Sequence, residues 1–165
     1  MKTLGKSKLT INGHYLRENA LSEKKKFRFL EHRADAYIEV YGKTLAEAFE
    51  NAALATFEVM TETKKIMPKH EETVEVEGFD EKALLYNWLE SLLVKFDTTQ
   101  TLYSKFKIEN IQKTDKCLKL KATIQGETYN PKKHPQKVGV KAVTYHRMEV
   151  KQTPSKTTAK FILDI

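Results

Sequence analysis

Hydrophobic and polar residues alternate along several short segments of this chain, and two longer segments repeat hydrophobic residues every three or four positions. Alternation is typical of a β-strand with one buried face, and the longer repeat is typical of a helix that packs on a core. We therefore predict strands over residues 27–29, 36–41, 73–77, 106–108, 117–124, 138–150 and 157–164.

The two segments with the helical repeat each follow a residue suited to capping a helix N-terminus. Thr44 precedes the first segment, and Glu47 lies three residues later, which is the spacing of a capping box. Asp80 precedes the second segment, which we expect to end near Phe96. The apolar stripes are formed by Leu45, Ala48, Phe49, Ala52, Ala53 and Phe57 in the first helix and by Leu84, Leu85, Trp88, Leu89, Leu92 and Leu93 in the second.

The order of these elements indicates the fold class. Strands precede, separate and follow the two helices, and the second half of the chain is rich in strands. This order favours a single-domain α+β fold, with two helices packed on one face of a mostly antiparallel sheet. We assign the domain to residues 27–165 and expect residues 1–26 to form a poorly ordered basic extension.

Positive charge is distributed unevenly along the chain. The formal net charge is +7, and residues 1–26 carry seven basic residues against two acidic ones. Most of the excess therefore belongs to the extension, and the domain is nearly balanced. We expect the extension to provide solubility, or weak steering toward RNA or an acidic partner, rather than a dedicated RNA-binding site.

Several features indicate a cytoplasmic protein without membrane contact. No apolar run is long enough for a membrane-spanning helix, and the first residues lack the apolar segment of a secretory signal. The only cysteine, Cys117, has no partner in the chain for a disulfide, which fits a reducing compartment.

The common catalytic motifs are absent from the sequence. It contains no phosphate-binding loop, no dinucleotide-binding glycine pattern, no Cys-x-x-Cys pair and no His-Glu-x-x-His helix. We therefore expect that the protein is not an enzyme, and we assign no catalytic residues.

Two aspartates are the most informative polar residues. Asp35 stands between two predicted strands, and Asp164 lies beside the terminal carboxylate of Ile165. If the last strand lies near residues 27–41, these oxygens could converge on a hard cation such as Ca²⁺ or Mg²⁺. Alternatively, Asp35 caps a turn and Asp164 is solvated, and the spacing alone favours this second interpretation.

Other polar residues permit weaker hypotheses. His32 could order the carboxylate of Asp35, although a structural histidine is the commoner case. The polar stretch 141–146 is explained as the hydrogen-bonding exterior of a strand. The loop 129–135 could contact phosphate, but lysines in loops are usually solvated.

An ordered set of short motifs resembles the archease family, and the resemblance covers residues 27–165. Each motif alone is weak, but the set in this order is specific. The matching segments are residues 29–35, 41–50, 57–61, 84–89, 132–135, 140–146 and 163–165.

The resemblance implies an accessory protein of an RtcB-type RNA ligase. Such proteins promote the guanylylation by GTP of the ligase's active-site histidine and permit multiple turnover in tRNA splicing and RNA repair. The resemblance also implies a divalent metal site, for Ca²⁺, Mg²⁺ or Mn²⁺, at Asp35, Asp164 and the terminal Ile165. The sequence departs from the family pattern at Arg33, where threonine is usual, and at Glu62, where aspartate is usual.

Two other classes of function compete with this interpretation. One is a basic module that binds RNA or a methyltransferase in the manner of a chaperone, using the extension and the loop lysines. The other is a metal-dependent hydrolase, for which the sequence reveals neither a base nor an enclosed pocket.

Overall fold

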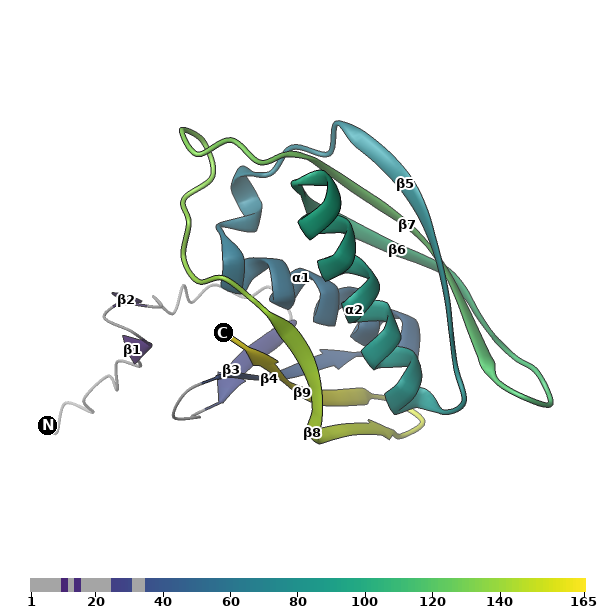
Figure 1. The fold of residues 1–165 in the computed structure, drawn as a ribbon. Helices are drawn as coiled ribbons and strands as arrows, with labels where there is room; N and C mark the ends of the chain where they lie inside the picture. The colour runs from purple at the N-terminus through teal and green to yellow at the C-terminus, as the bar shows by residue number, and fades with distance from the viewer. Residues whose placement is uncertain (1–9, 12–13, 16–24, 31–34) are drawn as a thin grey trace, which may run out of the picture.

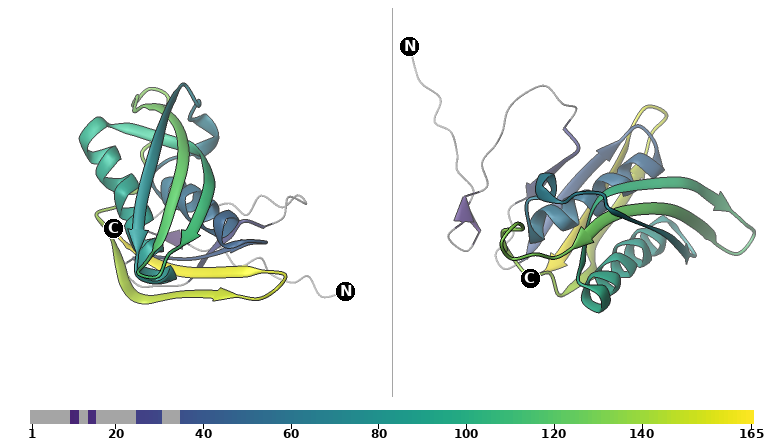
Figure 2. Two further views of the ribbon diagram at one scale, coloured as in Figure 1. Left: turned by 90° about the vertical axis from the view of Figure 1, so that its right-hand side faces the viewer. Right: turned by 90° about the horizontal axis from the view of Figure 1, so that it is seen from above.

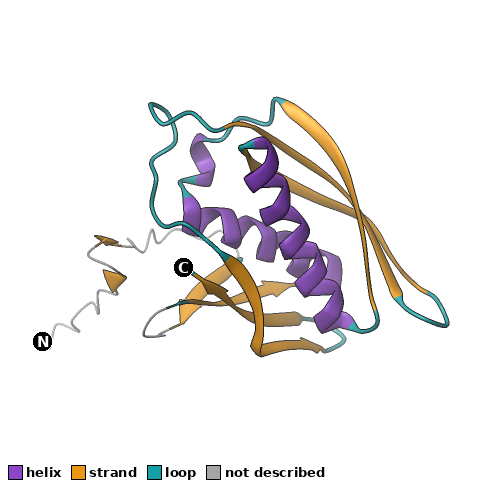
Figure 3. Cartoon of the chain, in the orientation of Figure 1, coloured by secondary structure: helices purple, strands orange, loops and turns teal. Residues whose placement is uncertain are grey.

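The computed structural model describes residues 10–11, 14–15, 25–30 and 35–165 (Figures 1 and 3). The expectation for residues 1–26 falls mostly outside this part of the chain, within which β1 and β2 pair with each other. The helices are α1 (Leu45–Met60), the short 3₁₀ helix η1 (Thr63–Lys65) and α2 (Glu81–Thr99). The strands are β1 (Thr10–Ile11), β2 (His14–Tyr15), β3 (Phe27–Leu30), β4 (Ala36–Gly42), β5 (His70–Gly78), β6 (Thr101–Lys113), β7 (Leu118–Thr128), β8 (Ala142–Gln152) and β9 (Thr157–Asp164).

Both helices begin at the predicted caps. The Thr44 hydroxyl accepts a hydrogen bond from the Glu47 backbone N–H at 3.1 Å, and the Glu47 carboxylate accepts one from the Lys43 N–H at 2.6 Å. The Asp80 carboxylate caps α2 by accepting from the N–H of Ala83 at 2.7 Å. These bonds satisfy donors that a helix leaves unpaired in its first turn. None of the helices in the described residues is long and apolar enough to cross a membrane.

The strands form two larger antiparallel sheets. One sheet has the order β3-β4-β9-β8, and the other has the order β5-β7-β6. The predicted α+β class and the single domain are confirmed, but the predicted single sheet is divided in two. The helices carry apolar residues around much of their circumference, so each helix can pack on both sheets.

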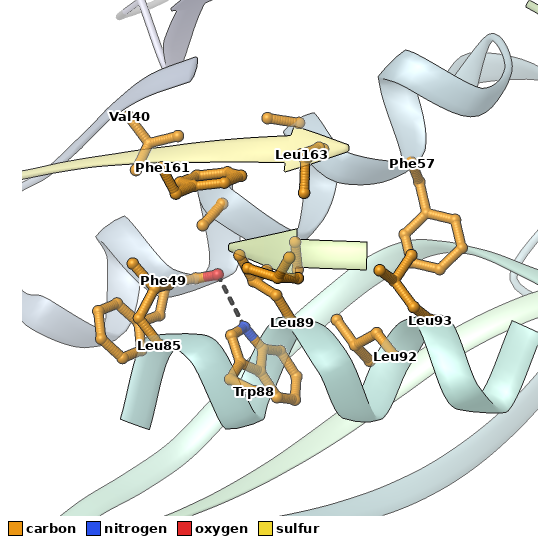
Figure 4. Close-up of a cluster of buried hydrophobic side chains, with 14 of the residues drawn as sticks. Val40, Phe49, Phe57, Leu85, Trp88, Leu89, Leu92, Leu93, Phe161 and Leu163 are labelled. Atoms are coloured by element: carbon orange, nitrogen blue, oxygen red, sulfur yellow. Dashed lines mark hydrogen bonds between the residues drawn. The ribbon is translucent and has the colours of Figure 1, made fainter. Parts of the chain in front are cut away.

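The core lies where the helices fill the space between the two sheets, which lie on opposite sides of them (Figures 1 and 2). Trp88 of α2 is completely buried and donates its indole N–H to the Phe49 carbonyl of α1 at 3.0 Å (Figure 4). Val40 and Phe161 reach the same cluster from β4 and β9. The inner face of the four-stranded sheet is therefore fixed against the helices, and its outer face is turned away from them.

Some predicted boundaries differ from the structure. The strand predicted at 138–150 begins at Ala142, because the preceding backbone turns to α1 and Lys137 donates its N–H to the Met60 carbonyl at 3.0 Å. The strand predicted at 106–108 extends to 13 residues. Helix α2 continues past the predicted end and stops where Gln100 adopts a left-handed conformation, with φ 53°.

Candidate functional site

The pairing of β4 with β9 brings the two predicted aspartates to the same end of the sheet. In this antiparallel ladder Ala36 pairs with Leu163. Asp35 immediately precedes Ala36, and Asp164 immediately follows Leu163, so the same register continued by one residue places them opposite each other. Directly opposite residues of antiparallel strands have Cβ atoms about 5 Å apart. The strand proximity on which the metal hypothesis depended is therefore confirmed.

Both aspartates belong to the outer face of the sheet. Successive residues of a strand point to opposite faces. Ala36 and Leu163 are buried on the helix-covered face, with exposed fractions of 2% and 0%, so their neighbours Asp35 and Asp164 belong to the other face. Asp164 is exposed and Asp35 is half-buried. The carboxylates thus occupy a position that a partner molecule can approach.

The third predicted donor, Ile165, is held by Lys141. The backbone N–H of Lys141 donates to the Asp164 carbonyl at 2.8 Å, and its ammonium donates to the main-chain oxygen of Ile165 at 3.2 Å. The Ile165 side chain packs against the core. The segment before β8 therefore fixes the last residues of β9 and places a positive charge at the main-chain oxygen of Ile165.

The donor set fits a hard divalent cation better than zinc. It consists of carboxylate and main-chain oxygens, which Ca²⁺ and Mg²⁺ prefer, whereas zinc favours Cys and His. Among the described residues, no three His, Cys, Asp or Glu side chains gather closely enough to hold a metal. A cation here would therefore need the Ile165 oxygen, water, or a donor outside the described residues.

Other residues singled out in the sequence have varied positions. His32 and Arg33 lie outside the described residues. Glu62 stands at the N-cap position of η1, where its side chain makes no capping hydrogen bond, and its carboxylate pairs with Lys65 at 3.2 Å. In β8, the Thr144 hydroxyl accepts from the backbone N–H of His146 at 3.1 Å, which agrees with a structural role for the polar stretch.

A buried polar cluster joins Glu127, near the end of β7, to the loop that follows, and the sequence patterns did not reveal it. Glu127 is only 4% exposed, and its carboxylate accepts hydrogen bonds from the Met67 N–H at 2.8 Å and from Lys133. Lys69 pairs with it at 2.8 Å. His134 is completely buried and accepts from the N–H of Asn130 at Nδ1, so its Nε2–H donates to Glu127 at 3.0 Å.

These contacts keep Glu127 ionised. Burial disfavours the charged form, but the hydrogen bonds from Lys133, Lys69, the Met67 N–H and His134 outweigh it and lower the pKa of Glu127 well below its usual range. Lys133, predicted to be a solvated loop lysine, therefore anchors the loop. No alternation pattern signalled this, because the loop itself buries Glu127.

A second anchor connects the same loop to the end of α1. The Lys137 ammonium donates to the Glu58 carbonyl at 2.9 Å and to its carboxylate at 2.7 Å. That carboxylate also accepts from the Thr63 N–H and hydroxyl. The loop is thus fixed at several points before it reaches Lys141, so the position of Lys141 beside Ile165 depends on the whole loop.

Comparison with known proteins agrees with this fold. A sequence model of the Archease protein family matches residues 27–165. Protein archease of Sulfurisphaera tokodaii is 46% identical over 140 residues, covering 85% of this chain and 99% of the relative. Protein archease of Sulfolobus acidocaldarius is 47% identical over 140 residues with the same coverage. The solution structure of Methanobacterium thermoautotrophicum protein 1598 is similar with a TM-score of 0.76 and 43% identity, covering 86% of this chain and 100% of that one.

A family model that spans the whole described domain and relatives of this identity and coverage lead to one conclusion: the chain belongs to the archease family.

Proposed function

We propose that this protein activates an RtcB-type RNA ligase, using a divalent cation held by Asp35, Asp164 and a main-chain oxygen of Ile165. Membership of the archease family supports this role, because the resemblance implies a ligase partner in tRNA splicing and RNA repair. The observation that carries the proposal is the β4–β9 register. It brings two carboxylates that are far apart in the sequence to one end of an exposed sheet face.

The proposed mechanism uses the exposed end of the sheet as a docking tip. A bound Ca²⁺, Mg²⁺ or Mn²⁺ ion would supply positive charge that carboxylate and phosphate oxygens can share. Asp164 is exposed and can approach the mouth of the ligase active site, while Lys141 holds the main-chain oxygen of Ile165 in place. Docking favours the ligase conformation in which its histidine reacts with GTP, and release of the protein allows the next cycle.

A ligation assay with limiting ligase and excess RNA tests this function. We expect Asp35→Asn and Asp164→Asn each to reduce the RNA joined per ligase by about tenfold or more, because loss of even an outer-shell partner of a metal site typically costs about tenfold. Asp115→Asn, which removes an exposed carboxylate in the β6–β7 turn, serves as the matched control. Full multiple turnover with both site variants would contradict the proposal.

A chain extended beyond Ile165 tests the third donor. The Ile165 oxygen lies beside Lys141 and its side chain packs on the core, so added residues would alter the donor without removing an aspartate. We expect reduced stimulation of the ligase with an unchanged thermal unfolding midpoint. Undiminished stimulation would remove Ile165 from the proposed ligands.

A further inference from the structure

The outer face of the four-stranded sheet carries a row of charges that crosses all four strands. Arg28 of β3 pairs in register with Glu39 of β4, Glu39 with Lys160 of β9, and Lys160 with Glu149 of β8. The alternation that puts Asp35 on this face also puts Glu39 there, four residues further along β4. The charge row and the aspartate pair therefore share one surface.

Glu39 organises the cations of this row. It is only 6% exposed, accepts a hydrogen bond from the Tyr41 hydroxyl at 2.6 Å and another from Arg28, and lies 3.9 Å from the Lys160 ammonium. Burial opposes its ionisation, but the hydrogen bonds from Tyr41 and Arg28 outweigh burial and lower the pKa of Glu39. Glu39 is thus a buried anion whose charge is compensated by its own neighbours.

A cavity of about 250 Å³ opens beside this row, at the end of the sheet where β8 turns into β9. Two of its lysines project from the hairpin: Lys151 is 72% exposed, and the exposed Lys156 lies over the Tyr41 ring, 4.4 Å from its centroid. The cavity is lined by Glu39, Glu149, Lys151, Thr153, Lys156, Thr158 and Lys160. It therefore offers ammonium groups, hydroxyl groups and a neighbouring aromatic ring.

The acidic side chains of the cavity do not compensate all of this positive charge. Glu149 lies 3.1 Å from the Lys151 ammonium and 3.8 Å from that of Lys160, while Glu39 is occupied as described above. The Lys156 ammonium contacts the Tyr41 ring, and within the part of the chain that the structure describes it forms no ion pair with a carboxylate. Two carboxylates thus stand against three lysines, with Arg28 adding a fourth cation to the same row, and the exposed ammonium groups can bind a further anion.

We propose that this cavity binds the phosphate backbone of single-stranded RNA, with Lys151 and Lys156 as its main phosphate contacts. Lysine and hydroxyl donors are the common contacts to phosphate oxygens, and basic grooves with aromatic side chains bind single strands without reading their sequence. The volume suits one nucleotide unit rather than a duplex. The inference is independent of the proposed activation of a ligase.

The position of the cavity sets how far a bound RNA must extend to reach the aspartate pair. Figure 1 shows the β8–β9 hairpin and the C-terminal end of β9 at opposite ends of the sheet. Tyr41, beside the cavity, is six residues from Asp35, and a strand rises about 3.3 Å per residue. RNA anchored in the cavity and lying along β4 and β9 would therefore reach the aspartate pair about 20 Å away.

Fluorescence anisotropy with a labelled single-stranded RNA and the full-length protein tests this inference. We expect the double variant Lys151→Ala/Lys156→Ala to bind about tenfold more weakly, and its salt dependence between about 50 and 200 mM to fall by a slope of about 1.4, since two phosphate contacts are lost. The control Lys113→Ala/Lys116→Ala removes the same charge from exposed positions at the β6–β7 hairpin and should stay within about twofold of the wild type.

Several outcomes would overturn the inference. Undetectable RNA binding by the wild-type protein at low salt is one, and an equal loss of affinity in both double variants is another. Complete loss of binding in a full-length Lys24→Gln/Lys25→Gln/Lys26→Gln variant would locate the contact in the extension instead. Equally tight binding of an acidic peptide, with the same dependence on Lys151 and Lys156, would assign the cavity to a protein partner.

Discussion

Asp35 and Asp164 illustrate what single residues reveal in a sequence. Their types and positions next to predicted strands identified them as candidates, because aspartate is uncommon in strands. Their pairing could not be derived from residue spacing, since it depends on which strands become neighbours. The β4–β9 register supplied that information, and the metal that they would bind remains our proposal.

Glu127 illustrates the opposite case. Its position after the predicted strand 117–124 resembles that of an ordinary exposed loop residue, yet it lies in β7 and is buried with Lys69, Lys133 and His134 around it. The burial results from a loop that follows it in the chain, and hydrophobic periodicity carries no information about such coverage. Residues buried by loops are therefore the part of this structure least accessible to sequence reasoning.

We expect Glu127→Gln to lower the free energy of unfolding by about 1–3 kcal/mol at pH 7, because hydrogen bonds to a buried carboxylate are lost. The folded-state pKa of Glu127 is lowered, so its contribution is present above the unfolded value of about 4.3 and is lost as the pH falls toward the folded value. Urea unfolding at pH 7 and pH 3 should therefore show a smaller difference between wild type and variant at pH 3.

The control for this prediction is Glu75→Gln. Glu75 is 70% exposed and lies 3.8 Å from Lys121, so its loss should change stability by no more than about 0.5 kcal/mol. If the difference in free energy of unfolding between wild type and Glu127→Gln grows as the pH falls, the folded-state pKa of Glu127 is raised rather than lowered.

The helices and strands were predicted well where local signals were strong. Thr44 and Asp80 marked the true N-termini of α1 and α2, because a capping side chain acts within one helical turn. The start of β8 was misplaced, since a contact between Lys137 and Met60 diverts the chain before it joins the sheet. Distant contacts of this kind leave no local pattern.

Gly126 in β7 provides a test of strand packing. A Cβ at this position would lie 1.9 Å from the Leu102 carbonyl oxygen of β6, whereas a Cβ at Gly139 would meet no atom within 4 Å. We expect Gly126→Ala to lower the free energy of unfolding by at least about 2 kcal/mol, because two backbones must separate.

Denaturant unfolding of Gly126→Ala beside Gly139→Ala checks this expectation. The Gly139 variant should remain within about 1 kcal/mol of the wild type. Equal stability of the two variants would show that β6 and β7 approach each other less closely at Gly126 than described.

At the scale of the whole molecule, the described residues combine two larger sheets with two α-helices between them. The sequence indicated the class and the number of helices, but it did not indicate that the strands divide into two sheets. A single sheet and a pair of sheets bury the same alternating strand faces, so the hydrophobic patterns cannot distinguish the two arrangements. The consequence for function is an outer sheet face with the aspartate pair at one end and the basic cavity at the other.

The two ends of this face should act independently. Sites about 20 Å apart without shared contacts usually have additive effects. We expect Asp164→Asn to leave the affinity for an RNA too short to reach the aspartate pair unchanged within about twofold, and Lys151→Ala/Lys156→Ala to leave cation affinity equally unchanged. Anisotropy and cation titration of both variants check this, and a tenfold effect of either change at the other end would show that the sites are coupled.

The most direct test of the cation site is isothermal titration of Mn²⁺ and Ca²⁺ into the wild-type protein, Asp35→Asn and Asp164→Asn, with Asp115→Asn as the control. The wild type and Asp115→Asn should bind one ion per chain, and each site variant should bind it about tenfold or more weakly. Equal binding by all four proteins, or no binding by the wild type, would contradict the claim that the paired aspartates hold a cation.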